Sequence, residues 1–481
     1  MIRKNVVIKY LGYILLFNAL FLFISATISF FNGENSLNAL LFSAALSATL
    51  GIFPYIFVEK IDEIRFQEGL AISVLGWIVT CIVGMIPYFI WGGEFSLSNA
   101  LFESVSGYTT TGASILNDVE ALPKGLLFWR SSTSFIGGVG IILFVLLVLP
   151  VKKGVQASFY RSEVSDLSKM SFRTRSRHIT RIIATVYFSL IIVETILLKL
   201  FGMSFFDAVC HSFSTIATSG FSTRNRSIAA YDNIWIELVI MFFMLVSSLH
   251  FGLVYATMTR QKHTIFTSRP TRMYMLVILI GILLITLQLT NERVFSFWES
   301  LRHAAFQVIS LVSTTGLVTA DTSLWPFFSI ILLTYYSIQC GMVGSTAGGI
   351  KFDRIYIYFS SVSKQLKLIL HPNGIYAVKM DQKVIEHDLE LQIVVFISLY
   401  ILTLFITALL LSAMGIDGTT AFSASFATIG NVGPGFGSVS SMANYGHLPD
   451  AAKYLLSANM LLGRLEIMNV FALFIMLCGK K

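Results

Sequence analysis

The sequence carries little charge for its length. Lysine, arginine, aspartate and glutamate make up 12% of its 481 residues, whereas 55% are hydrophobic and the mean hydropathy is +0.76. Soluble globular domains carry about 25% charged residues. The composition therefore argues against a soluble enzyme or binding module and predicts an all-α polytopic membrane protein.

Cysteines and catalytic motifs are also scarce. The four cysteines lie in or near apolar runs without CxxC spacing, so they predict small buried side chains rather than disulfides or zinc ligands. They are Cys81, Cys210, Cys340 and Cys478. The glycine-rich stretch from Gly433 to Gly437 is not a phosphate loop, because Ser438 stands where that motif needs glycine. No GxSxG or HExxH motif is present, and we expect no enzyme activity.

Long apolar runs dominate the rest of the chain. A helix that crosses a membrane needs about 20 apolar residues. We predict ten such helices, at residues 6–31, 36–58, 69–91, 124–150, 179–201, 231–258, 273–290, 322–350, 388–413 and 446–478. The first run is too long for a signal peptide and is closely followed by another, so we expect it to be retained.

The basic residues are distributed unevenly among the loops. Of the 34 lysines and arginines, 25 fall on one side of the ten-helix arrangement, and both termini lie on that side. Basic residues stay mainly on the cytoplasmic side of short loops, so we predict cytoplasmic termini. This topology accounts for the net charge of +8 without nucleic-acid binding.

Four short polar segments that end in glycine recur between pairs of predicted helices. Their last three residues are Thr110-Thr111-Gly112, Thr218-Ser219-Gly220, Thr314-Thr315-Gly316 and Asn431-Val432-Gly433. An alanine stands 12 residues before each glycine, at Ala100, Ala208, Ala304 and Ala421. A single Thr-x-Gly is more often a turn in an exposed loop. Four copies in one hydropathic frame instead predict four copies of one unit around a common axis.

Each unit is predicted to be a helix, a short re-entrant pore helix of two or three turns, a filter loop and a second helix. Non-helical backbone at membrane depth is tolerated inside protein or along a water-filled path. The chain then divides into two N-terminal helices (1–66) and four pore units in a pseudo-fourfold ring, A (67–160), B (161–265), C (266–372) and D (373–481). Rings of backbone carbonyls replace the hydration shell of a weakly hydrated monovalent cation, so the twelve residues above are the predicted ion-binding filter.

Arg464 lies inside the last apolar run, where a charge costs about 2.5–3.5 kcal/mol on insertion scales. It should therefore face a partner or a wet cavity. We favour a positive side chain below the filter that raises the barrier to a passing cation. The alternative is an internal ion pair, with Glu466 or another acid, that only joins helices.

A glycine-rich run interrupts the second helix of unit C. Its marked residues are Gly341, Gly344, Ser345, Thr346, Gly348 and Gly349. Each glycine disfavours a continuous helix by about 1 kcal/mol, so we predict a flexible gate across the ion path. The alternative is close helix packing through small residues.

Several polar residues near the predicted pore helices have other expected roles. We expect Glu103, His211, Arg302 and Gln307 to brace the filter by hydrogen bonds rather than to bind the cation. Asp207 and Asp417 could cap their short helices. Glu194, in the first helix of unit B, is either a proton-linked carboxylate or a structural acid with a buried partner.

The layout and motifs resemble the Trk/Ktr/HKT superfamily of cation transporters over essentially the whole chain. The resemblance is carried by residues 109–114, 217–223, 313–317 and 428–437, by the Gly-Gly-Ile-Lys end of the broken helix and by Gly-Arg-Leu-Glu at 463–466. It implies a single-chain pseudo-tetramer with a filter at the four glycine segments, a gating loop at 341–350 and a pore-facing Arg464. It also implies a homodimer in the bacterial cytoplasmic (inner) membrane. Its regulator would be a cytosolic ring of TrkA-like subunits that bind NAD or ATP/ADP.

This filter departs from the Thr-Val-Gly-Tyr-Gly sequence of tetrameric potassium channels. One glycine is shared by all four copies, and Asn431 replaces threonine in the fourth. We therefore expect weaker discrimination of potassium from sodium. Because all four glycines are present, the family pattern still indicates potassium rather than sodium as the preferred ion.

Two modes of transport remain open from the sequence. We favour gated, passive potassium uptake driven by the membrane potential, and the alternative is a proton- or sodium-coupled potassium symporter. K⁺ is then the transported ion, and we expect no organic cofactor on this chain because the nucleotide would bind the partner. The long basic loops 151–178 and 351–387 are the predicted contacts with that partner.

Overall fold

Helices make up nearly all of the computed structural model, which describes residues 3–58, 64–148, 172–259, 264–381 and 383–478. Two short sheets also occur: β1 (Gln339–Cys340) pairs in parallel with β2 (Ile350–Lys351), and β3 (Lys379–Met380) pairs antiparallel with β4 (Lys383–Val384). In the described residues, six helices are long and apolar enough to cross a membrane, and two bent helix pairs raise that number to eight. The predicted all-α membrane class is therefore confirmed.

The first two helices pack closely against each other. They are α1 (Lys4–Phe31) and α2 (Leu37–Phe57). A Cβ added at Gly51 would lie 2.8 Å from the carbonyl oxygen of Gly12, and one added at Gly12 would lie 2.9 Å from that of Gly51. Small residues of this kind let two membrane helices approach backbone to backbone. The pair also contacts the rest of the molecule, because α1 packs against two helices of unit A.

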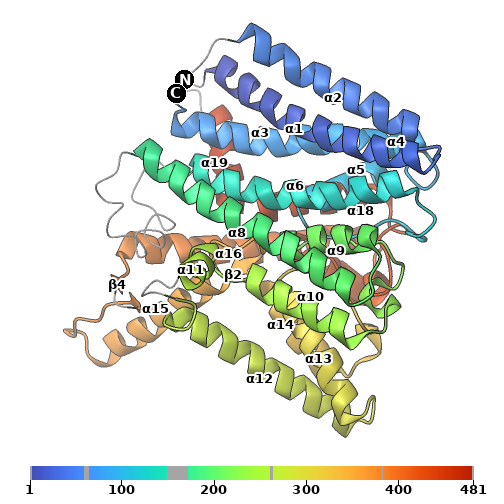
Figure 1. The fold of residues 1–481 in the computed structure, drawn as a ribbon. Helices are drawn as coiled ribbons and strands as arrows, with labels where there is room; N and C mark the ends of the chain where they lie inside the picture. The colour runs from blue at the N-terminus through green and yellow to red at the C-terminus, as the bar shows by residue number, and fades with distance from the viewer. Residues whose placement is uncertain (1–2, 59–63, 149–171, 260–263, 382, 479–481) are drawn as a thin grey trace.

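After this pair in the chain, a sequence of long helix, short helix, irregular segment and second helix occurs four times (Figure 1). Unit A contains α3 (Phe66–Gly84), α4 (Ile86–Trp91), α5 (Leu97–Tyr108) and α6 (Lys124–Val148). Unit B contains α8 (Phe172–Leu200), α9 (Phe205–Ala217), η2 (Ser227–Ala230), α10 (Ile234–Ser247) and α11 (Phe251–Met258). Unit C contains α12 (Arg269–Asn291), α13 (Phe297–Val312), η3 (Thr322–Leu324), α14 (Phe327–Ile338) and α15 (Phe352–Leu370). Unit D contains α16 (His387–Ala413), α17 (Gly418–Ile429), η4 (Gly437–Val439), α18 (Asp450–Arg464) and α19 (Ile467–Cys478).

The short helices α5, α9, α13 and α17 begin at side-chain caps. Ser96, Ser204 and Asp417 each accept a hydrogen bond from a first-turn N–H, and they occupy equivalent positions before their glycines. The hydroxyl and N–H of Thr420 hold the pKa of Asp417 below its usual value. The expected cap at Asp207 is wrong, because Ser204 caps α9 and Asp207 follows in its first turn. The helices have 12 to 16 residues, which is longer than the two or three turns predicted.

The second helices of units B, C and D are interrupted, whereas the sequence predicted continuous spans in units B and D. The α10–α11 pair bends by 109° at residues 248–250, and the α18–α19 pair bends by 98° at residues 465–466. His250 makes the first break possible because its side chain caps α11. The second break, between α18 and α19, lies at Glu466, which adopts a left-handed conformation with φ of 60°. In unit C, α14 has 12 residues and is too short to cross a bilayer alone.

The close α1–α2 contact yields a stability prediction. Replacing Gly51 by leucine forces these backbones apart, and we expect it to destabilise the folded protein by about 1–3 kcal/mol, the usual range for overpacking. Thermal unfolding of the purified protein in detergent measures the effect. Ala45→Leu is the matched control, because Ala45 lies on the exposed face of the same helix. Equal melting temperatures for the two variants would contradict the prediction.

Candidate functional site

The four glycine segments meet in a closed ring. Each glycine faces the carbonyl oxygen of the residue that precedes the next glycine along the chain, and the last faces the first. The pairs are Gly112 with Ser219, Gly220 with Thr315, Gly316 with Val432, and Gly433 with Thr111. A Cβ at any of these glycines would lie closer than 3.0 Å to the facing oxygen, a separation that real Cβ atoms essentially never show. No residue with a side chain fits at any of the four ring positions without displacing backbone.

The backbone repeats the same unusual conformation in all four segments. The ring glycines have φ between 72° and 97°, and the residue two positions earlier also lies in the left-handed region. These earlier residues are Thr110, Thr218, Thr314 and Asn431, with φ of 53°, 57°, 59° and 53°. Such values are uncommon for residues other than glycine. Their fourfold occurrence indicates a required turn that connects each short helix to the ring.

Hydrogen bonds to the short helices hold each turn in place. The N–H of the residue before each glycine donates to a carbonyl five residues earlier, over 2.8–2.9 Å. These bonds run from Thr111 to Ser106, Ser219 to Ser214, Thr315 to Ser310 and Val432 to Ala427. The helix C-termini are therefore anchored directly beside the ring.

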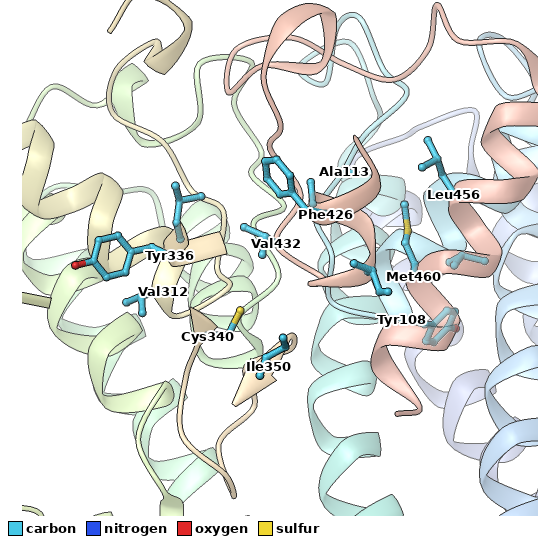
Figure 2. Close-up of a cluster of buried hydrophobic side chains, with 14 of the residues drawn as sticks. Tyr108, Ala113, Val312, Tyr336, Cys340, Ile350, Phe426, Val432, Leu456 and Met460 are labelled. Atoms are coloured by element: carbon cyan, nitrogen blue, oxygen red, sulfur yellow. The ribbon is translucent and has the colours of Figure 1, made fainter. Parts of the chain in front are cut away.

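The side chains next to the glycines turn back into the protein. The hydroxyl of Thr111 bonds that of Thr109 at 2.8 Å, and the hydroxyl of Ser219 bonds that of Ser134 at 2.6 Å. Thr315 makes the equivalent bond to Ser313 at 2.8 Å. Val432 is apolar, and Figure 2 shows it among buried side chains that include Val312, Cys340 and Met460. The ring is thus built from main-chain atoms, with its side chains used as supports.

A polar pocket of about 130 Å³ adjoins one side of the ring. All four ring glycines line it, together with residues that follow them in all four units. Arg130 and Arg224 also line it, and both are paired with carboxylates. At its rim, Asn225 donates a 2.8 Å hydrogen bond to Asp118 and holds the pKa of that carboxyl below its usual value. The ring therefore borders a polar space.

A buried ion pair supports the ring between units A and B. The Nε of Arg130 lies 2.5 Å from Glu103, and both side chains are almost fully buried. Glu103 also accepts hydrogen bonds from Ser114 and Ile115, which follow Gly112 in the ring. Arg130 donates to the carbonyl of Ser222 at 2.8 Å. Sequence reasoning missed Arg130, although a charge inside the apolar run 124–150 was the same signal that marked Arg464.

The other predicted bracing residues make contacts of the expected kind. His211, equivalent to Glu103 in unit B, bonds the hydroxyl of Ser222 at 2.9 Å. Gln307, the equivalent in unit C, donates to the carbonyl of Ala320 at 3.4 Å. Arg302 instead pairs with Glu237 at 2.7 Å and joins α13 to α10. Each brace is a different chemical pair, so the four units are supported unequally.

The glycine-rich run packs against the side of the ring opposite the pocket. The N–H of Gly348 donates to the hydroxyl of Thr314 at 2.9 Å, and Thr346 donates to the carbonyl of Ile216 at the end of α9 at 2.9 Å. Gly348 also lies too close to the carbonyl of Gly430 to accept a Cβ. The run therefore contacts the ends of short helices or the glycine segments in units B, C and D.

The remaining glycines of the run lie where another group approaches closely. Gly341 faces the carbonyl of Ser248, Gly344 faces the ring of His250, and Gly349 faces the sulfur of Cys340. Gly344 and Gly349 also have positive φ, at 81° and 58°. Within the run, Ser345 donates to the carbonyl of Met342 at 2.6 Å. Close packing by small residues and an irregular loop thus occur together in this segment.

The glycine-rich run forms backbone hydrogen bonds with the break in unit B. Its Met342 N–H donates to Ser248 at 2.8 Å, and its Gly344 carbonyl accepts from Phe251 at 3.2 Å. Ser248 and Phe251 are the residues at the α10–α11 bend. The bend therefore exposes backbone groups that the run pairs with.

Arg464 is 2% exposed and holds the same run from unit D. Its guanidinium donates to the carbonyls of Thr346 at 2.8 Å and Gly137 at 3.1 Å. The expected alternative, an ion pair with Glu466, is wrong: Glu466 pairs with Arg354 at 2.6 Å. The left-handed turn at Glu466 separates the two side chains.

Two predicted features lie outside the pocket lining or outside the described residues. Glu194 is fully buried on α8, and neither carboxylate oxygen has a hydrogen-bond partner in the described part of the chain. Of the predicted partner loop 151–178, residues 151–171 lie outside the described residues. The other predicted loop, 351–387, contains α15 and the β3–β4 hairpin.

Comparison with known proteins identifies relatives along nearly the whole chain. A family model described as TrkH, cation transport protein, matches residues 35–480. The Trk system potassium uptake protein TrkH of Halomonas elongata is 34% identical over 441 residues, covering 90% of this chain and 91% of that protein. The Trk system potassium uptake protein TrkG of Escherichia coli is 35% identical over 416 residues, covering 86% and 85%.

A solved structure agrees with the fold. The crystal structure of the potassium transporter TrkH from Vibrio parahaemolyticus matches with a TM-score of 0.89 and 29% sequence identity, covering 98% of each chain. The resemblance to Trk proteins predicted from the motifs is therefore confirmed, and so is the expectation of a transporter rather than an enzyme. The chain belongs to the TrkH family of cation transport proteins.

Proposed function

We propose that this protein takes up potassium through the ring of glycine segments, which acts as a carbonyl-lined selectivity filter. The closed set of glycine–carbonyl approaches is the observation that carries the proposal. Potassium is the ion named for its relatives, the TrkH and TrkG uptake proteins. Carbonyl oxygens replace the hydration shell of a weakly hydrated cation without supplying a full charge that would trap it.

The short helices add an electrostatic contribution. The C-terminal ends of α5, α9, α13 and α17 lie beside the ring, and each carries about half a negative charge from its aligned peptide dipoles. Four such ends stabilise a cation on the side of the ring opposite the pocket. This favours a path that runs from the pocket, through the ring, toward the glycine-rich run.

The glycine-rich run and Arg464 form the proposed gate. The run contacts three units on the side of the ring opposite the pocket, so in this scheme the run must move aside before an ion can pass. Arg464 holds the run through Thr346 and places a positive charge beside the path. In this scheme, opening breaks the hydrogen bonds that the run makes with both Thr314 and Arg464.

A cytosolic nucleotide-binding subunit is the proposed regulator, acting on a homodimer in the bacterial cytoplasmic membrane with both termini inside the cell. The favoured contact is α15 with the β3–β4 hairpin, because α15 directly follows the gate run. Its apolar residues Phe359, Leu366 and Ile369 are exposed, and Ile375 in the following loop is 99% exposed. Movement of α15 would reach the gate through Arg354 and Glu466.

The membrane potential suffices as a driving force in this scheme. A potential of 100 mV contributes about 2.3 kcal/mol per elementary charge. Ion-coupled symport would need a carboxylate that the transported ions reach in turn. Glu194, the strongest candidate for that carboxylate, is buried on α8 and does not line the pocket at the ring.

The filter is tested by placing a side chain in the ring. Gly220→Ser should lower the discrimination of potassium from sodium by about tenfold, because the new Cβ displaces the carbonyl of Thr315. Competition between rubidium and sodium uptake into proteoliposomes measures this ratio. Gly415→Ser is the control, because Gly415 has a similar φ of 86° with nothing within 4 Å. Undiminished discrimination in Gly220→Ser would refute the filter.

The gate is tested at Arg464. Arg464→Ala removes both hydrogen bonds and the charge, so rubidium uptake without any regulatory subunit should rise by about tenfold or more. Arg464→Lys keeps the charge but loses the planar two-carbonyl contact, and intermediate uptake is expected. Fluxes are compared at equal reconstituted protein. If both variants match the unsubstituted protein, Arg464 does not hold the gate.

Passive transport and symport are separated at Glu194. In liposomes without a proton or sodium gradient, Glu194→Gln should carry rubidium as fast as the unsubstituted protein, and both should stop at the electrochemical equilibrium of rubidium. The amide keeps the shape of the acid but cannot exchange a proton. Accumulation beyond equilibrium that follows an imposed pH gradient, and that this substitution abolishes, would establish symport instead.

A further inference from the structure

The ring has one seam that the chain does not bridge. Units A, B, C and D follow one another in the sequence, so A–B, B–C and C–D are joined by linkers, whereas D meets A through contacts alone. Several hydrogen bonds cross this seam, and some of them involve the filter loop of unit A. Three of them run from Asn431 to the hydroxyl of Thr111 at 3.0 Å, from Asn444 to Asn117 at 3.0 Å, and from the N–H of Tyr445 to the carbonyl of Ser114 at 2.8 Å.

Tyr445 lies at the centre of this seam. Its ring packs against Phe102 of α5, with centroids 5.3 Å apart, and the residue is 2% exposed. Its phenolic hydroxyl donates a 2.8 Å hydrogen bond to the carbonyl of Gly433 in the ring. One residue therefore contacts the filter loop of unit A through its backbone and the filter of unit D through its side chain.

The bond to Gly433 makes the four glycine carbonyls of the ring unequal. Within the described residues, the carbonyls of Gly112, Gly220 and Gly316 accept no hydrogen bond from protein. The fourth glycine carbonyl, that of Gly433, already accepts the hydrogen bond from Tyr445. All four glycines and Tyr445 border the same pocket, so the glycine carbonyls are the first ring atoms that an ion entering from the pocket meets.

We infer that Tyr445 sets the affinity of the outermost potassium position by holding back one of its four carbonyl ligands. The donated proton carries partial positive charge and occupies a lone pair that would otherwise face the cation. The outer position then has three fully available carbonyls and binds potassium more weakly than a symmetric ring would. Weak binding at the entrance favours rapid exchange with the pocket, which conduction requires. This inference rests on the proposed filter.

Removing the hydroxyl alone tests the inference. Tyr445→Phe frees the Gly433 carbonyl, so the dissociation constant for potassium should fall by about two- to tenfold, the usual net effect of one neutral hydrogen bond. Titration calorimetry of the purified full-length protein with KCl measures the constant, and rubidium uptake should show a lower half-saturating concentration. An unchanged or raised dissociation constant would overturn the inference.

Two matched variants separate this effect from general loosening. Tyr336→Phe removes another buried tyrosine hydroxyl, which donates to the carbonyl of Val277 at 2.7 Å, and should leave potassium binding unchanged. Asn444→Ala breaks a seam bond without touching a ring carbonyl. If Asn444→Ala tightens binding as much as Tyr445→Phe, seam geometry rather than the hydroxyl is responsible, and the inference fails.

A fluorinated tyrosine at position 445 gives the opposite test. It keeps the shape of the side chain but makes the phenol a stronger donor, so at slightly acidic pH potassium binding should weaken. Tighter or equal binding would contradict the inference. Gly220→Ser tests the filter separately from Tyr445, because the hydrogen bond of Tyr445 goes to Gly433 instead. If Gly220→Ser shifts selectivity while Tyr445→Phe has no effect, only the role of Tyr445 is lost.

Discussion

The whole site depends on the close approach of four glycines to four carbonyl oxygens. At none of these positions is there room for a Cβ, so the ring exists only if four chain segments reach one point with no side chain between them. The surrounding structure serves this requirement. Capped short helices lead into the segments, and a left-handed residue turns each one. Hydroxyl pairs in three segments and apolar packing of Val432 in the fourth hold the side chains away from the centre. The steric fit of the four glycines therefore brings the carbonyl oxygens together without any bound ion.

Much of this arrangement could be read from local sequence. The apolar runs fixed the helical class, and the recurring glycines with their matching alanines located the segments that meet. What escaped prediction depends on contacts between distant residues. Arg130 stands out as a charge inside an apolar run, but its partner Glu103 lies on another helix, and Tyr445 contacts unit A from the far end of the chain, so neither partner could be read from the local pattern. Arg464 and Glu466 misled for the opposite reason: they are neighbours in sequence, but a left-handed turn directs them to different partners.

The four units share a backbone plan but differ in chemistry. Their braces are an ion pair in unit A, a histidine in unit B and a glutamine in unit C. The second helices of units B, C and D are interrupted, and the three breaks meet at the glycine-rich run. A single chain permits such inequality, because each unit can change without altering the other three. Unit C thus supplies the glycine-rich run, while its neighbours supply residues that hold it.

The unbridged seam between units D and A has a consequence for biosynthesis. Asn431 and Thr111 are bonded across it although 320 residues separate them in the chain. Synthesis proceeds from the N-terminus, so unit A enters the membrane long before its last neighbour exists. Until then the carbonyl of Thr111 has no glycine to face, and the nascent protein holds an open arc of polar backbone that lipid cannot satisfy. Insertion of the final quarter of the chain is therefore the event that closes the ring of glycine segments.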